Sequence, residues 1–192
     1  MLEKFLAMYP PDAGCIPLEQ SVVDALAPSV TPEVLALWQN GVGTYGNGLL
    51  QVVDPIKYEP AIYPYIMRDE KKRYVPLILT AFGSLYYLRQ LNNPNTPMYP
   101  HDITLLDPQT GYAKHILFEV DEFFSDHLQK DSTRQDELQL DAFQKAMAAG
   151  VPPPTRDQML CHTPMRALGG DGDPTRCTLG DALVHWDMLR QI

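Results

Sequence analysis

The chain has 192 residues, of which 45% are hydrophobic and 20% charged, and its net charge is −9. This composition is ordinary for a globular protein and argues against a disordered chain. The excess of acid disfavours direct binding to nucleic acid or to membranes, and no apolar run is long enough to cross a membrane. Because the N-terminal segment is also too short and too acidic for a signal peptide, we expect a cytoplasmic protein.

The first third of the chain predicts helices and a short strand. Thr31 occupies an N-cap position, and Gly41 is well placed to end that helix in the left-handed conformation. A strand over 49–53 and a short helix over 54–58 follow. Residues 68–73 are predicted to form a charged loop or hairpin tip.

The middle of the chain predicts an antiparallel meander. Four segments rich in aromatic and branched side chains have the composition of strands: 74–81, 84–91, 103–106 and 112–118. The five residues 107–111, with the sequence DPQTG, are a good hairpin loop between the last two strands.

The final third is predicted to be mainly helical. Apolar side chains at helical spacing indicate helices over 119–130, 132–149 and 181–191, with a short strand at 176–179. The order helices, strands, helices predicts the α+β class, with the antiparallel meander flanked by N-terminal and C-terminal helices. We assign residues 1–118 to one α+β domain and 119–192 to a mainly helical C-terminal domain packed on it.

The motifs of catalysis and of metal binding are incomplete. The glycine-dense run over 41–48 follows a helix and has no lysine after it, which indicates a structural turn and not a phosphate-binding loop. Residues 169–173 lack the later acidic ligand of a calcium loop. No nucleophile motif of the GxSxG type occurs. We therefore expect no enzymatic activity, no metal ion and no cofactor.

Cysteines and histidines leave one alternative open. Cys161, His162, Cys177 and His185 are of zinc-ligand types, but their spacing matches no common site. Together with Cys15 the cysteines are odd in number and have no paired spacing, which is typical of free thiols in a reducing compartment. Buried thiols and ordinary polar histidines are the favoured interpretation, and a small metal- or thiol-dependent hydrolase is the alternative.

Acid is concentrated in one segment. Residues 119–141 carry eight acidic side chains against Lys130 and Arg134, a net charge of −6. Carboxylates one helical turn apart, such as Glu122 and Asp126, would suit acid–base catalysis, but their density favours a solvated acidic face. Such a face attracts a basic partner, whereas the simplest alternative is that it only keeps the protein soluble.

Three segments, taken in their order along the chain, resemble a known family. They are LALWQNGVG at 35–43 leading to GNGLL at 46–50, TAFGSLYY at 80–87, and LGG at 168–170 followed by a terminal helix ending in LRQ. Together these segments resemble the GAD-like-domain proteins that have a C-terminal domain of unknown function. Members of that family are immunity proteins found beside DNase effectors of type VI secretion systems. The SMI1-like immunity superfamily is a related possibility and implies a similar role.

The resemblance implies that residues 1–118 are a GAD-like domain and that the chain binds and inhibits a cognate nuclease toxin by covering its DNA-binding surface. The local charge then places the partner contacts in the acidic segment, at Asp121, Glu122, Asp126, Asp136 and Glu137. The acidic N-terminal region is an equal candidate surface. A generic protein-binding adaptor is a further alternative.

Overall fold

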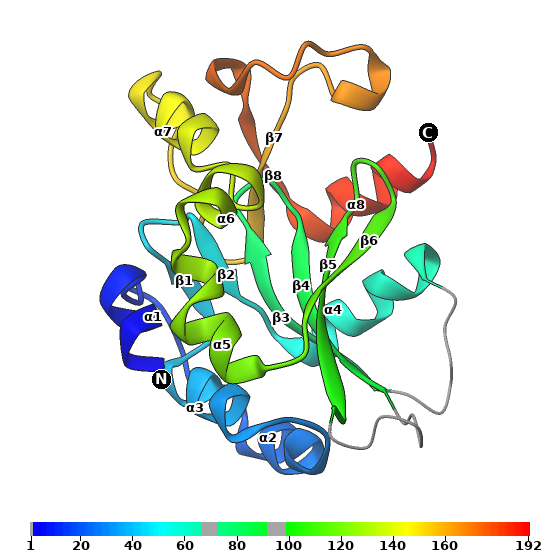
Figure 1. Ribbon diagram of the computed structural model, residues 1–192. Coiled ribbons are helices and arrows are strands. Elements are labelled where there is room, and N and C mark those ends of the chain that lie inside the picture. Colours follow the sequence, from blue (N-terminus) through cyan, green and yellow to red (C-terminus); the bar gives the residue numbers. More distant parts are fainter. Residues whose placement is uncertain (1, 67–72, 92–98) are drawn as a thin grey trace.

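The computed structural model describes residues 2–66, 73–91 and 99–192 (Figure 1). The charged loop predicted over 68–73 lies, apart from Arg73, outside the described residues. Across the described residues, the predicted α+β class is confirmed, because an antiparallel meander is flanked by helices from both ends of the chain.

Six antiparallel strands form the main sheet, and each strand lies beside the next one in the sequence. The strands are β1 (Gly43–Tyr45), β2 (Leu50–Val52), β3 (Tyr74–Thr80), β4 (Leu85–Gln90), β5 (His101–Asp107) and β6 (Tyr112–Leu117). The predicted loop joins β5 to β6, and the carboxylate of Asp107 fixes it by accepting hydrogen bonds from Gln109 N at 2.9 Å and Thr110 Oγ1 at 3.0 Å.

In the described residues the α-helices that precede the sheet are α1 (Leu2–Met8), α2 (Gln20–Leu26) and α3 (Pro32–Asn40). The helix α3 was predicted, and Thr31 is its N-cap as expected, although its side chain makes no capping hydrogen bond. Gly41 follows the helix as predicted, but its φ of 107° with ψ 153° is not the left-handed helical conformation, so that detail was wrong. The extended ψ of Gly41 lets Val42 pair with Ile16, through hydrogen bonds of 2.7 and 3.1 Å.

Helices cover both faces of the sheet (Figure 1). Side chains alternate across a strand, so on β4 Tyr86 and Leu88 join one hydrophobic cluster and Leu85 and Tyr87 join the other. The first cluster contains residues of α1, α3 and α5 (Val120–Ser125), and the second contains residues of α4 (Pro55–Ile62) and α8 (Ala182–Arg190). Burial on both faces explains why the sequence of β3 is apolar almost throughout.

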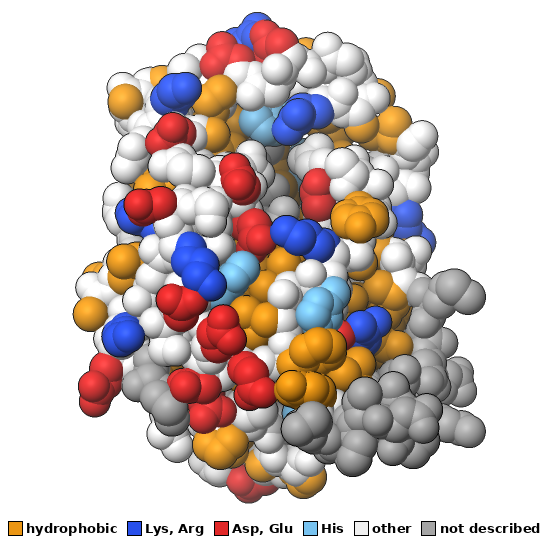
Figure 2. Space-filling view, viewed as in Figure 1, with side chains coloured by type: hydrophobic (Ala, Val, Ile, Leu, Met, Phe, Trp, Pro, Cys, Tyr) orange, Lys and Arg blue, Asp and Glu red, His pale blue; other side chains and the backbone are white. Residues whose placement is uncertain are grey.

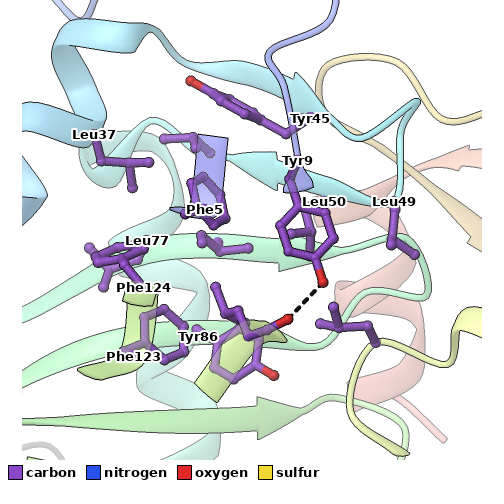
Figure 3. Close-up of a cluster of buried hydrophobic side chains, with 14 of the residues drawn as sticks. Phe5, Tyr9, Leu37, Tyr45, Leu49, Leu50, Leu77, Tyr86, Phe123 and Phe124 are labelled. Atoms are coloured by element: carbon purple, nitrogen blue, oxygen red, sulfur yellow. Dashed lines mark hydrogen bonds between the residues drawn. The ribbon is translucent and has the colours of Figure 1, made fainter. Parts of the chain in front are cut away.

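The first cluster joins α1 to the segment that directly follows the sheet (Figure 3). Phe5 of α1 packs edge-on against Phe124 of α5, with ring centroids 5.5 Å apart. The hydroxyl of Tyr9 donates a hydrogen bond of 2.7 Å to the carbonyl oxygen of Leu128. One core therefore contains side chains from both predicted domains, and the division at residue 118 stays a prediction.

The predicted helices over 119–130 and 132–149 are each interrupted. The first becomes α5 and a 3-10 turn (His127–Gln129), and the second becomes α6 (Asp131–Asp136) and α7 (Leu140–Ala148). Gln139 has φ 53° at the second break, and Leu138 beside it is fully buried. The breaks turn Glu137 and Leu138 toward the sheet, a tertiary requirement that helical periodicity does not reveal.

A small antiparallel pair, β7 (Gln158–Cys161) with β8 (Thr178–Asp181), precedes α8. The sequence predicted a strand near β8 but missed β7. The pair is held to the main sheet by Leu160 N, which donates to Ala81 O at 2.7 Å. Trp186 of α8 donates from Nε1 to Gly83 O at 3.0 Å.

Candidate functional site

An acidic surface lies over α5, α6, the segments that flank them and the start of α7 (Figure 2). Six carboxylates between residues 119 and 141 are exposed and define this surface: Glu119, Glu122, Asp126, Asp131, Asp136 and Asp141. Basic side chains lie beside these carboxylates and partly neutralise them. Lys130 Nζ lies 2.6 Å from Asp126 Oδ2, and Arg134 Nη1 lies 3.3 Å from Asp131 Oδ1.

The five predicted contact residues fall into different environments. Glu122, Asp126 and Asp136 are exposed on the acidic surface. Asp121 is half-buried, and its Oδ1 has no hydrogen-bond partner among the described residues. Glu137 is only 11% exposed, so the structure brings three of the five to the surface and turns Glu137 inward.

Glu137 is the centre of a hydrogen-bond network between α6, the 3-10 turn and the sheet. Its Oε2 accepts from the hydroxyl of Tyr86 on β4 at 2.7 Å and lies 2.8 Å from Nε2 of His127. Its Oε1 lies 3.3 Å from Nζ of Lys114 on β6. The network fixes the acidic surface to the sheet, which no spacing in the sequence could have shown.

The charge of Glu137 is stabilised by these neighbours. Burial raises the pKa of Glu137, but hydrogen bonds from His127 and Tyr86 outweigh it, and the pKa is lower than usual. The pKa of Tyr86 is raised well above its ordinary value by burial, by the charge of Glu137 and by their hydrogen bond. Glu137 is therefore an ionised acceptor and Tyr86 a neutral donor.

On the surface itself, the Asp126–Lys130 pair is exposed to solvent. The hydrogen bond from Lys130 lowers the pKa of Asp126, and the same bond raises the pKa of Lys130. An exposed pair of this kind contributes little to stability because water screens it. Its carboxylate is therefore available to exchange Lys130 for a basic group of a partner.

A second candidate site lies at the C-terminal end of the fold. A pocket of about 440 Å³ between the β7–β8 pair and α8 is lined in part by Cys161, His162 and His185. Cys177 lies beside it, with its Sγ 3.3 Å from Nδ1 of His162, and the ring of His162 stacks on Phe82. The structure thus gathers the four residues whose sequence spacing matched no common site.

The electrostatics of this cluster do not favour nucleophilic chemistry. Burial raises the pKa of the Cys161 and Cys177 thiols to about 11, and burial lowers the pKa of His162 and His185. Both groups of the Cys177–His162 contact are then neutral, whereas the reactive form of cysteine is the thiolate. In the described part of the chain, no group of three or more cysteine, histidine or acidic side chains is placed to hold a metal ion. The hydrolase alternative gains no support from this geometry.

A comparison with protein families gives a match in the N-terminal part of the chain. Residues 1–94 match the family model of the GAD-like domain. This part of the chain is therefore similar to GAD-like domains. The match includes β1 to β4 and stops before β5, whereas the sequence analysis placed the end of this domain at residue 118.

The fold as a whole has a solved counterpart. The crystal structure of Atu4351 from Agrobacterium tumefaciens is similar over 100% of this chain and 89% of that chain, with a TM-score of 0.69 and 14% sequence identity. At this identity the likeness shows a shared fold alone. A search of curated proteins gave no match.

Both candidate sites contain residues of the region that matches the GAD-like domain. Tyr86 binds Glu137 beneath the acidic surface, and Phe82 stacks on His162 beside the C-terminal pocket. Both residues belong to the segment TAFGSLYY, one of the three on which the family resemblance rests. Among the described helices, none combines the length and apolar character needed to span a bilayer.

Proposed function

We propose that this protein is an immunity protein, which binds a cognate nuclease toxin in the cytoplasm and blocks it without any chemical step. The observation that carries the proposal is the acidic surface, with six exposed carboxylates in a segment of net charge −6. The GAD-like domain is compatible with this role. A DNase effector of a type VI secretion system is the toxin class that we favour.

The physical argument concerns the surface that a nuclease must present. An enzyme that binds DNA needs basic side chains around its cleft to neutralise phosphates. An acidic protein of complementary shape competes for the same side chains and excludes DNA. Opposite charge also speeds the encounter, and this contribution falls as salt concentration rises.

The network around Glu137 supports the same proposal. Tyr86, His127 and Lys114 hold the end of α6 against the sheet before any partner arrives. A surface that is already ordered loses less conformational entropy on binding than a flexible one. The acidic surface is therefore suited to a long-lived complex and not only to a fast encounter.

The test is co-purification with the product of the adjacent gene, followed by a DNase assay of that product and binding kinetics over a range of salt concentrations. The double variant Glu122→Lys with Asp136→Lys reverses two exposed charges on the acidic surface. We expect its affinity to fall by roughly tenfold or more, which is about 1.4 kcal/mol, and its association rate to depend less on salt.

The matched control is Asp171→Lys with Asp187→Lys, which makes the same charge change at exposed positions near the C-terminus, outside the acidic surface and outside the acidic N-terminal region. This control should retain affinity if the acidic surface is the interface. Equal losses in both double variants would mean that net charge alone matters. If the nuclease forms no complex with the unmodified protein and keeps its activity, the immunity proposal is wrong.

A further inference from the structure

The C-terminal pocket has the dimensions of a small-molecule site. Its volume of about 440 Å³ lies within the range of roughly 300–1,000 Å³ that is usual for ligand pockets. Most of the lining side chains are apolar, and they come from the β7–β8 pair, from α8 and from the segment between β7 and β8. The proposed immunity role makes no use of this pocket.

The rim of the pocket is apolar and open to solvent. Leu168 is 61% exposed, Val184 is 60% exposed and Met188 is 41% exposed. Exposed apolar side chains scattered singly need no explanation, but a contiguous group around a cavity often marks a binding site. These three side chains line the same pocket from η4 (Arg166–Leu168) and α8. An apolar molecule that covered them would remove this surface from water, which is favourable.

The lining offers no positive charge. Among the lining residues that the structure describes there is no lysine and no arginine. Burial lowers the pKa of both His162 and His185, so the two imidazoles are neutral near pH 7. The hydroxyls of Thr163 and Thr178 lie 3.2 Å apart and satisfy each other. An anionic ligand would therefore find no opposite charge in this pocket.

Asp181 gives the lining its formal charge, which is negative. Its side chain is exposed, and its Oδ1 accepts a hydrogen bond of 3.0 Å from Val184 N, which caps α8. Within the described part of the chain, its Oδ2 accepts no hydrogen bond and its carboxylate forms no ion pair. A carboxylate beside apolar surface attracts a cation more strongly than one surrounded by water, because the effective dielectric constant is lower there. The lining therefore complements a ligand that joins an apolar body to one positive charge.

We propose that this pocket binds a small, mainly apolar molecule that carries one positively charged amino group, and that the carboxylate of Asp181 holds this group at the rim. The apolar lining supplies most of the binding free energy, and the charge pair selects cationic ligands over neutral ones of the same shape. The site does not depend on the proposed immunity function, because none of its lining residues belongs to the acidic surface.

The experiment uses 4-phenylbutylamine and 4-phenylbutanol as matched probes, of which the first carries an ammonium group at neutral pH and the second a neutral hydroxyl. Binding is followed by NMR of the full-length protein with ¹³C-labelled methionine methyl groups. Met165 and Met188 line the pocket, whereas Met8 is an exposed methionine of α1 and serves as the internal control. We expect saturable shifts at Met165 and Met188 but not at Met8. The amine should bind roughly 3- to 10-fold more tightly than the alcohol, and about 1 M salt should abolish this preference.

Two variants separate the charge from the apolar pocket. Asp181→Asn removes the charge but keeps a good N-cap residue, so α8 should stay folded. In this variant the amine should bind no more tightly than the alcohol, and the alcohol should bind as before. Val184→Trp places a large ring at the exposed rim and should weaken both probes. The matched control is Asp187→Asn, which removes an exposed carboxylate of α8 outside the lining and should keep the preference for the amine.

Three results would overturn the proposal. The first is the absence of saturable shifts at Met165 and Met188 with either probe. The second is equal affinity of the unmodified protein for the amine and the alcohol. The third is a preference for the amine that survives in Asp181→Asn. If neither probe binds and Val184→Asp weakens a complex with the product of the adjacent gene, the rim is a protein-docking surface instead.

Discussion

Glu137 is an acidic residue, as its predicted role in partner binding requires, but its side chain is largely buried and not exposed to a partner. The sequence placed it among the exposed partner contacts, because it belongs to a segment of dense acid. In the structure its carboxylate is 11% exposed and accepts from Tyr86 while contacting His127 and Lys114. The neighbours that decide its role come from β4, β6 and the 3-10 turn, and local charge density carries no information about them.

At this scale we predict that Glu137→Gln lowers the free energy of unfolding by about 1–3 kcal/mol at pH 7, because it weakens charge-assisted hydrogen bonds in a buried network. The exposed change Glu122→Gln is the control and should have an effect within about 0.5 kcal/mol. Urea denaturation measures both, and an equal effect of the two substitutions would contradict the network's importance.

The same residue predicts a pH dependence. Because the folded pKa of Glu137 is lower than its ordinary value of about 4.3, its contribution to stability is complete above that value. The contribution is lost as the pH falls through the folded pKa, where the carboxylate becomes protonated. The difference in unfolding free energy between the unmodified protein and Glu137→Gln should therefore shrink below about pH 4. A difference that stays constant down to pH 3 would be evidence against this assignment.

Helices and strands were predictable from the sequence where their own residues determine where they begin and end. Asp54 begins α4 as expected, since its Oδ1 accepts hydrogen bonds from the backbone N–H groups of Ile56 and Lys57. The strands of the meander were confirmed because their apolar composition and the DPQTG loop act locally. The breaks after α5 and α6 and the strand β7 were missed, because packing against distant segments determines them.

One turn between elements offers a direct test. Gly48 has φ 82°, and a Cβ there would lie 2.7 Å from the carbonyl oxygen of Pro154. Gly111 has φ 67° and no atom within 4 Å of the corresponding position. Gly111→Ala should cost about 1–2 kcal/mol from backbone strain alone, and Gly48→Ala should cost more because the Pro154 segment must also move. Thermal or urea denaturation compares the two variants, and equal losses would mean that the Pro154 contact is unimportant.

At the scale of the whole molecule, the core crosses the predicted division at residue 118. Phe123, Phe124 and Leu128 are fully buried against residues of α1 and the sheet. Each fully buried side chain of this size contributes about 1.5–3 kcal/mol, and a whole domain is stable by only about 5–15 kcal/mol. The two parts are therefore expected to stabilise each other.

This leads to a prediction for the fragment 1–118. Without α5 it should lack a cooperative unfolding transition and should expose the cluster around Phe5 and Tyr86 to an apolar fluorescent dye. Circular dichroism and dye binding measure these properties, with the full chain as the reference. A fragment that unfolds cooperatively would show that residues 1–118 are an independent domain.

The sequence by itself determined the fold class, the order of the meander and the site of greatest negative charge, because each depends on composition, periodicity or turn residues that act over short distances. Only the tertiary structure decided which carboxylates are exposed, where the helices break and which side chains surround the C-terminal pocket. Those features depend on contacts between residues far apart in the chain, such as Tyr86 with Glu137 and Phe82 with His162. A lone sequence contains no measure of those distances, so the residues of both sites became visible only after folding had brought them together.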